Sequence, residues 1–154
     1  MKNKSEIVRL LLLQLDEQIS QYQTTLAETR KQVIDAPSAS QSHSDTSKIQ
    51  LSGLALGQEG RLREIEMATI SLRNLNLSPR DRVVAGAVFV ILGRDGERKS
   101  YFMFPGAQAV SVEVEGEIVT SISAKSPLGT AVLGKKKGDK ATYIVGEVEI
   151  IEVF

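Results

Sequence analysis

Apolar residues recur in alternating steps of four and three along most of the first half of this sequence. One series comprises Val8, Leu12, Leu15, Ile19, Tyr22, Leu26, Thr29 and Val33, and a second comprises Leu51, Ala55, Gln58, Leu62, Ile65, Thr69 and Leu72. This spacing keeps each series on one stripe of a helix and leaves polar residues elsewhere on its surface. We therefore predict two long helices, each with a seam for a partner helix.

The polar stretch DAPSASQSHSDTSK, residues 35–48, separates the two series. Pro37 and the serines around it would break a continuous helix, so we expect two helices of about 25 to 30 residues to pack antiparallel as a hairpin roughly 40 Å long. Half of a helical bundle and a parallel coiled coil formed by dimerisation are the alternatives. The matched lengths of the two seams favour a hairpin within one chain, with its tip at about residues 35–48.

Three glycines interrupt the second helical segment near this tip. They are Gly53, Gly57 and Gly60. Each glycine costs a helix interior roughly 1 kcal/mol relative to alanine. The tip end of the second helix is therefore predicted to be its less stable end.

The pattern changes from helix to strand at about Ser78. The segments VVAGAVFVIL and KSYFMF read as strands, and AVSVEVEGEIVTSIS alternates with period two through Val110, Val112 and Val114 and again from Ile118. Two more short strands are expected on either side of Gly146. Glu113, Glu115 and Glu117 are expected on the exposed face.

One short helix is predicted within this second half, in SPLGTAVLGKKKGD. Ser126 is a plausible N-cap, Pro127 suits the first helical position, and Gly134 can end the helix in a left-handed conformation. Leu128, Val132 and Leu133 would face a sheet. The predicted fold class is thus α+β, with an N-terminal antiparallel helical hairpin (residues 1–77) followed by a small antiparallel sheet domain with one short helix (residues 78–154).

Composition excludes several classes of function. Lysine plus arginine and aspartate plus glutamate each number 19 in 154 residues, so no strong net field exists to attract nucleic acid or a membrane. There is no cysteine, and the leucine run 10–13 is too short to span a bilayer. We expect a soluble, cytoplasmic protein.

Candidate catalytic and metal-binding residues are few. His43 is the only histidine, and in a serine-rich loop it is read as solvated rather than as a metal ligand. The run Lys135 to Lys137 could contact phosphate but is usually a solvated face. No nucleophile triad or glycine-rich phosphate loop can be assembled, so neither stand-alone catalysis nor a cofactor of its own is expected.

The stretch around the short helix resembles the carboxy-terminal signature of the bacterial Gre family of transcript-cleavage and elongation factors. The resemblance implies a carboxy-terminal domain similar in fold to FK506-binding proteins, which docks on RNA polymerase, and a monomer whose hairpin enters the secondary channel of the enzyme. The polymerase-binding residues would be Ser126, Pro127, Leu128, Leu133, Gly134 and Lys135. The positions that match the family pattern are Ser126, Pro127, Leu128, Ala131, Leu133, Gly134, Lys135, Gly138 and Asp139.

The family resemblance also assigns a role to the tip, in the string DTSKI at residues 45–49. Cleavage-stimulating members carry an acidic motif there, whose carboxylates help the polymerase hold a second Mg²⁺ and a water near the 3′ end of the nascent RNA. Asp45 and Ser47 match this motif, whereas Lys48 replaces its glutamate and Ile49 its asparagine. Asp45 would then assist polymerase-bound Mg²⁺, or serve as the N-cap of the second helix, or both.

Four interpretations of the function follow, two within the family and two outside it. The chain either modulates elongation or cleavage of backtracked transcripts, or occupies the channel as a competitor without stimulating cleavage. A prolyl isomerase would need an aromatic pocket, and the sequence has no tryptophan. A plain coiled-coil adaptor would be a dimer and would leave the signature of the second half unexplained.

Overall fold

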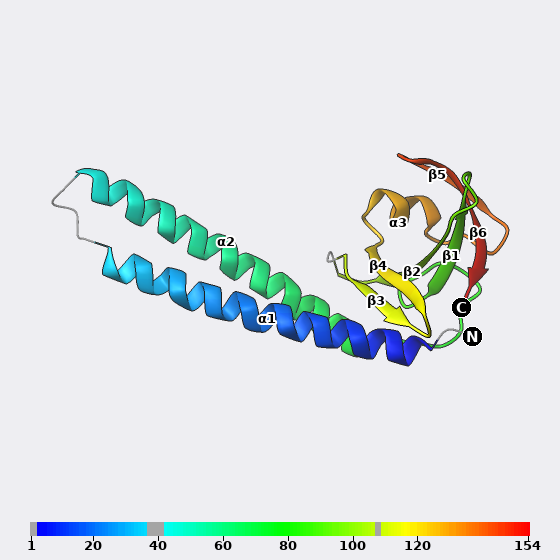
Figure 1. Cartoon of the computed structure of the whole chain (residues 1–154), viewed down its shortest axis with the longest axis horizontal. Coiled ribbons are helices and arrows are strands. Elements are labelled where there is room, and N and C mark those ends of the chain that lie inside the picture. Colours follow the sequence, from blue (N-terminus) through cyan, green and yellow to red (C-terminus); the bar gives the residue numbers. More distant parts are fainter. Residues whose placement is uncertain (1–2, 37–41, 107–108) are drawn as a thin grey trace.

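A computed structural model describes residues 3–36, 42–106 and 109–154, with the backbone alone for residues 42–45. Two helices come first and pack along each other as a hairpin that projects from a sheet domain (Figure 1). The elements in chain order are α1 (Lys4–Asp35), α2 (Ser42–Arg73), β1 (Val88–Gly93), β2 (Arg98–Phe104), β3 (Ser111–Val114), β4 (Glu117–Ser123), α3 (Pro127–Val132), β5 (Lys140–Tyr143) and β6 (Gly146–Val153). The predicted α+β class and the order of its parts are confirmed.

The seams predicted from the four-three spacing close the hairpin. Leu15, Leu26 and Thr29 of α1 are buried, as are Ala55, Ile65, Thr69 and Leu72 of α2. Ion pairs span the two helices from Arg30 to Glu59 and, at 3.4 Å, from Arg73 to Asp16. The hairpin therefore forms within one chain, as the matched seams indicated.

Both helices continue into the stretch that was expected to be a loop. Each has 32 residues, and α2 begins at Ser42, so residues 42–48 are helical rather than part of the tip connection. Serine, threonine and aspartate are weak formers of helix interiors but are favoured in a first turn, where they accept from free backbone N–H groups and complement the helix dipole. Residues 37–41 of the predicted tip lie outside the described residues.

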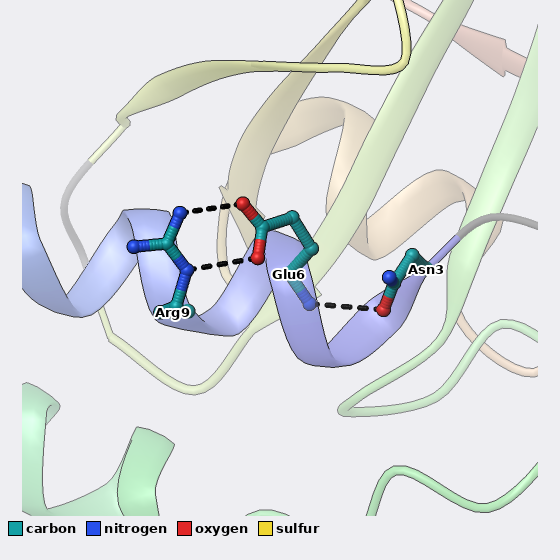
Figure 2. Close-up of polar contacts among 3 residues, drawn as sticks. All are labelled: Asn3, Glu6 and Arg9. Carbon is teal, nitrogen blue, oxygen red and sulfur yellow. Dashed lines mark hydrogen bonds and ion pairs between the residues drawn. The ribbon is translucent and has the colours of Figure 1, made fainter.

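The start of α1 is defined by a side-chain cap. Asn3 Oδ1 accepts a hydrogen bond from the backbone N–H of Glu6 at 3.1 Å, and Arg9 holds the Glu6 carboxylate through two nitrogens (Figure 2). This satisfies one of the free N–H groups of the first turn. The carboxylate also lies at the positive end of the helix dipole.

The sheet is mixed rather than antiparallel throughout. Its strand order is β3-β4-β2-β1-β6-β5, and β2 pairs in parallel with β4, while the other four pairs are antiparallel. The link between β2 and β3 carries the chain past the position of β4, so β4 returns beside β2 in the same direction. Alternation along each strand cannot specify this order, which explains why the sequence predicted a simpler sheet.

A tight turn between β3 and β4 changes the face on which apolar residues lie. Glu115 and Gly116 both have positive φ, of 55° and 78°, which is typical of a two-residue hairpin turn. Val114 pairs with Glu117 and Glu113 with Ile118, so Ile118 lies on the outer face and is 66% exposed. The alternation predicted to resume at Ile118 resumes one residue later, at Val119.

Two hydrophobic clusters cover the two faces of the sheet. One joins the base of the hairpin to the sheet and includes Ile7, Leu11, Leu15, Ile65, Leu72, Phe102, Phe104, Val112 and Val119. The other joins α3 to the opposite face and includes Phe89, Ile91, Met103, Leu128, Val132 and Ile150. Since both faces are covered, the first four residues of β1 are all buried. The domain boundary expected at residues 77 and 78 falls within the connection between α2, which ends at Arg73, and β1, which begins at Val88. The first of the two clusters contains residues from both sides of this connection.

Candidate functional site

The end of the hairpin presents the predicted tip residues at the start of α2. The backbone of Asp45 lies three residues inside the helix, so Asp45 is not the N-cap that the sequence suggested. The side chains of Asp45 and His43 lie outside the described residues. Ser47, Lys48 and Ile49 are exposed, and Ile49 exposes 71% of its surface.

Lys48 and Asp45 occupy positions three residues apart in one helix, about one helical turn. The carboxylate position of the family motif is thus followed, one turn later, by a cation. An exposed isoleucine follows the cation. On α1 the same end of the hairpin carries Ile34, which is 78% exposed. Among the side chains that the structure describes, this end of the hairpin therefore exposes the cation of Lys48, the carboxylate of Asp35 and two isoleucines.

The signature segment forms α3 and its flanking turns, which hydrogen bonds hold against the side of the sheet domain. Ser126 Oγ accepts from the backbone N–H of Gly129 at 3.0 Å and donates to the carbonyl of Ser123 at 2.7 Å. Gly134 has φ +77° and donates its N–H to the carbonyl of Val83 at 2.7 Å. The predicted cap and the predicted left-handed helix end are both confirmed.

Burial divides the residues that the resemblance assigned to polymerase binding. Pro127, Leu133 and Gly134 are exposed, Ser126 and Lys135 are half-buried, and Leu128 is buried against the sheet. Leu133 was expected to face the sheet but is 49% exposed, because α3 ends at Val132 and the chain turns outward. Of these six residues, Pro127, Leu133 and Gly134 are therefore the ones most accessible to another molecule.

The lysine run after α3 is partly neutralised. Lys136 Nζ lies 3.5 Å from a carboxylate oxygen of Asp81, and its backbone N–H donates to Asp139 Oδ2 at 2.8 Å. The predicted solvated face is consistent with Lys137, which is exposed. Glu113, Glu115 and Glu117 are exposed, as expected.

Aromatic residues meet in the sheet domain, which the sequence did not indicate. The rings of Phe89 and Tyr101 stack with centroids 5.7 Å apart. Burial raises the pKa of the Tyr101 phenol, and nearby Tyr143 adds to the shift. A cavity of about 270 Å³ beside Tyr143 is bordered by charged groups, among them Lys99 and Glu147. Phe89 is fully buried in the second hydrophobic cluster, and the partly buried Tyr101 packs against that cluster.

Neither a metal cluster nor a membrane helix emerges from the parts of the chain that are described. Within residues 3–36, 42–106 and 109–154, no three His, Cys, Asp or Glu side chains gather as metal ligands. Over the same ranges, no helix is both long and apolar enough to cross a bilayer.

A long helical hairpin packed through its base onto a small mixed sheet, with a capped short helix beside it, defines a two-part α+β architecture. Residues 78–153 match the family model described as transcription elongation factor, GreA/GreB, C-term. The chain belongs to the GreA/GreB family of transcription elongation factors.

Two relatives show how far the similarity extends. Transcription elongation factor GreA of Bartonella henselae is 30% identical over 141 residues, covering 82% of this chain and 83% of its own. The Mesorhizobium japonicum protein of the same name is 31% identical over 118 residues, covering 73% and 72%. Among solved structures, GreA factor homolog 1 (Gfh1) of Thermus thermophilus is 20% identical and covers 93% of this chain and 94% of its own, with a TM-score of 0.39.

Proposed function

We propose that this chain binds the RNA polymerase of its cell and inserts the tip of its hairpin into the secondary channel. There it modulates elongation or the cleavage of backtracked transcripts. The observation that carries the proposal is the hairpin itself, whose 32-residue helices extend about 48 Å and project beyond the sheet domain (Figure 1). Family membership supports the same partner, and that partner places the chain in the bacterial cytoplasm.

The two halves divide the work in this proposal. The sheet domain docks beside the channel entrance through exposed surface near Pro127 and Leu133, while the hairpin reaches the active centre. The chain acts as a monomer and performs no chemistry alone. Mg²⁺ and the reacting RNA belong to the polymerase, and Asp45 would assist the metal there.

A second candidate function is a channel competitor that does not stimulate cleavage. Lys48 and Ile49 favour it, because a cation near Mg²⁺ opposes the metal and an isoleucine supplies no oxygen ligand. The same lysine could pair with an acidic group of the polymerase or with RNA phosphate. Both candidates require channel entry and differ only in what the tip does there.

Channel entry is tested with the full chain carrying a photoreactive amino acid in place of Lys48. On a halted elongation complex we expect crosslinks to the catalytic subunit near the active centre and to the RNA 3′ end. The same photoreactive group at Arg94, in the exposed turn between β1 and β2, is the matched control and should not reach the RNA. A chain that binds the polymerase but crosslinks from residue 48 only to its outer surface would refute channel entry.

A further inference from the structure

Helix α2 carries a second four-three series on its outer side. We call it the outer seam, and its members are Ile49, Gly53, Leu56, Gly60, Arg63, Met67 and Ile70. Its four large apolar side chains are exposed by 71% for Ile49, 68% for Leu56, 58% for Met67 and 53% for Ile70. These positions precede the members of the buried seam by two residues, or about 200° around the helix, so the outer seam lies opposite the contact with α1.

The outer side of α1 has a different character. Near the base the corresponding positions include Leu13, which is 54% exposed, but farther toward the tip they are Glu17, Ser20, Thr24, Ala27 and Lys31, all exposed. A helix that faces only solvent carries such polar and charged residues. The outer seam of α2 therefore differs from a solvated face and has the spacing of an unfilled coiled-coil contact.

The fold does not require the glycines of α2. A Cβ added to Gly53, Gly57 or Gly60 would meet nothing within 4 Å, and none of the three has a left-handed φ. Each nevertheless costs the helix roughly 1 kcal/mol relative to alanine. A glycine on a helix surface lets another backbone approach closely, which is a use that the isolated chain does not realise.

The spacing and the charge of the outer seam indicate what kind of molecule would bind along it. We call this molecule the occupant. A repeat of 3.5 residues matches another α-helix lying along α2, because only a helix keeps side chains in register with such a stripe. Arg63 interrupts the apolar series, is exposed, and forms no ion pair with the residues that the structure describes. The occupant therefore needs an acidic side chain opposite Arg63.

A second copy of this chain fits the outer seam poorly. A parallel alignment sets Arg63 against Arg63. An antiparallel alignment that sets Arg63 against Glu64 directs the other hairpin toward the sheet domain, which borders this part of α2 at Pro105 and Gly106 around a groove of about 380 Å³. In that alignment a second copy would clash with the sheet domain, whereas a separate helix that ends at this groove would not.

We infer that the outer seam of α2 docks one helix of the RNA polymerase, a helix with apolar residues at four-three spacing and an acidic residue opposite Arg63. This inference rests on the proposed function. It adds that α2, rather than α1, faces the wall of the polymerase channel. Gly53 and Gly60 then lower the stability of the helix but allow the polymerase helix to approach its backbone closely.

The test compares binding of full-length variants to the polymerase. In one variant Gly53→Leu and Gly60→Leu fill the gaps, and since leucine is a better helix former than glycine the hairpin should fold at least as well. We expect affinity to fall about tenfold or more, as overpacked contacts do. Arg63→Glu should weaken binding to a similar degree, whereas Thr24→Leu, which places the same side chain on the outer side of α1, should not.

Crosslinking identifies the occupant. A photoreactive amino acid at Leu56 should label a helical polymerase segment that contains an acidic residue, and the same group at Thr24 should not. Wild-type binding that the α2 variants leave unchanged would overturn this inference and leave the proposed function standing. A wild-type chain with no affinity for polymerase would overturn both. A dimer in sedimentation that Gly53→Leu dissociates would show that the occupant is a second copy.

Discussion

A Cβ on Gly129 would lie 2.0 Å from the carbonyl oxygen of Ser123, closer than any real contact of that kind. The first turn of α3 thus runs directly against the end of β4. Ser126 Oγ, which bonds to both residues, would lie 2.9 Å from the same Cβ. The glycine of the SPLG signature is therefore a packing requirement of the sheet domain.

Gly129→Ala is expected to destabilise the chain by about 3 kcal/mol or more, because the obstructing atom is backbone and cannot rotate away. Urea unfolding followed by circular dichroism measures the change. Thr130→Ser, at an exposed position in the same helix, keeps its hydroxyl and should shift stability by less than about 0.5 kcal/mol. Equal effects from the two substitutions would contradict the packing argument.

Gly53→Ala should have the opposite effect on stability to Gly129→Ala. With open space around its added Cβ and a helical backbone, the substitution should stabilise the hairpin by up to about 1 kcal/mol, as should Gly57→Ala. Thermal unfolding and hydrogen exchange near the tip are the measurements. A lower melting temperature for either variant would mean that these glycines serve the isolated fold after all.

Leu11→Ala tests whether the hairpin and the sheet unfold together. Leu11 is 2% exposed within the core that joins them, so its truncation should cost about 2–5 kcal/mol. Hydrogen exchange should rise in β3 and β4 as well as in α1. Leu13→Ala, at a position of the same helix that is 54% exposed, is the control. Undiminished protection of β3 and β4 in the Leu11 variant would show two independent units.

The Glu6 carboxyl group provides a pH test at the start of α1 (Figure 2). The hydrogen bond from Arg9, followed by its charge, holds the pKa of Glu6 below its ordinary value. A depressed folded pKa gives stability that is present above the unfolded pKa and is lost as pH falls through the folded one. In Arg9→Gln the pKa measured by NMR should rise toward its ordinary value. An unchanged Glu6 pKa would assign the shift to the helix dipole instead.

Local patterns in the sequence predicted the elements well. The seams through Leu15 and Leu72 and the cap at Ser126 were predictable because each depends on residues within one or two turns. The packing of the hairpin base on the sheet was not, although Ile7 and Leu11, apolar residues outside the first seam, were a signal for a second contact. An apolar stripe on a helix indicates that another part of the protein packs against it, but it does not identify that part.

The order of the strands and the ends of the helices could not be predicted from the periodicity of the sequence. The parallel pairing of β2 with β4 depends on the path of a loop, and period-two alternation is the same in either direction. The start of α2 at Ser42 falls in a sequence rich in serine and aspartate, residue types that suit a helix start and a loop equally well. At the tip, the sequence placed Ser47 and Lys48 on the surface, and their roles there remain predictions.

Lys48 is the residue whose replacement should change the activity of the tip most. A cleavage-stimulating tip must bring negatively charged oxygen ligands to a Mg²⁺ ion that the polymerase holds weakly, and here a cation follows Asp45 by one helical turn. We expect the natural chain to stimulate cleavage of backtracked RNA weakly or not at all. Lys48→Glu with Ile49→Asn should raise cleavage by about tenfold or more, because a second carboxylate lowers the barrier of the metal-assisted step. Adding Asp45→Ala should abolish the gain while polymerase binding persists. Strong cleavage by the unmodified chain, unaffected by Asp45→Ala, would show that other residues carry the activity.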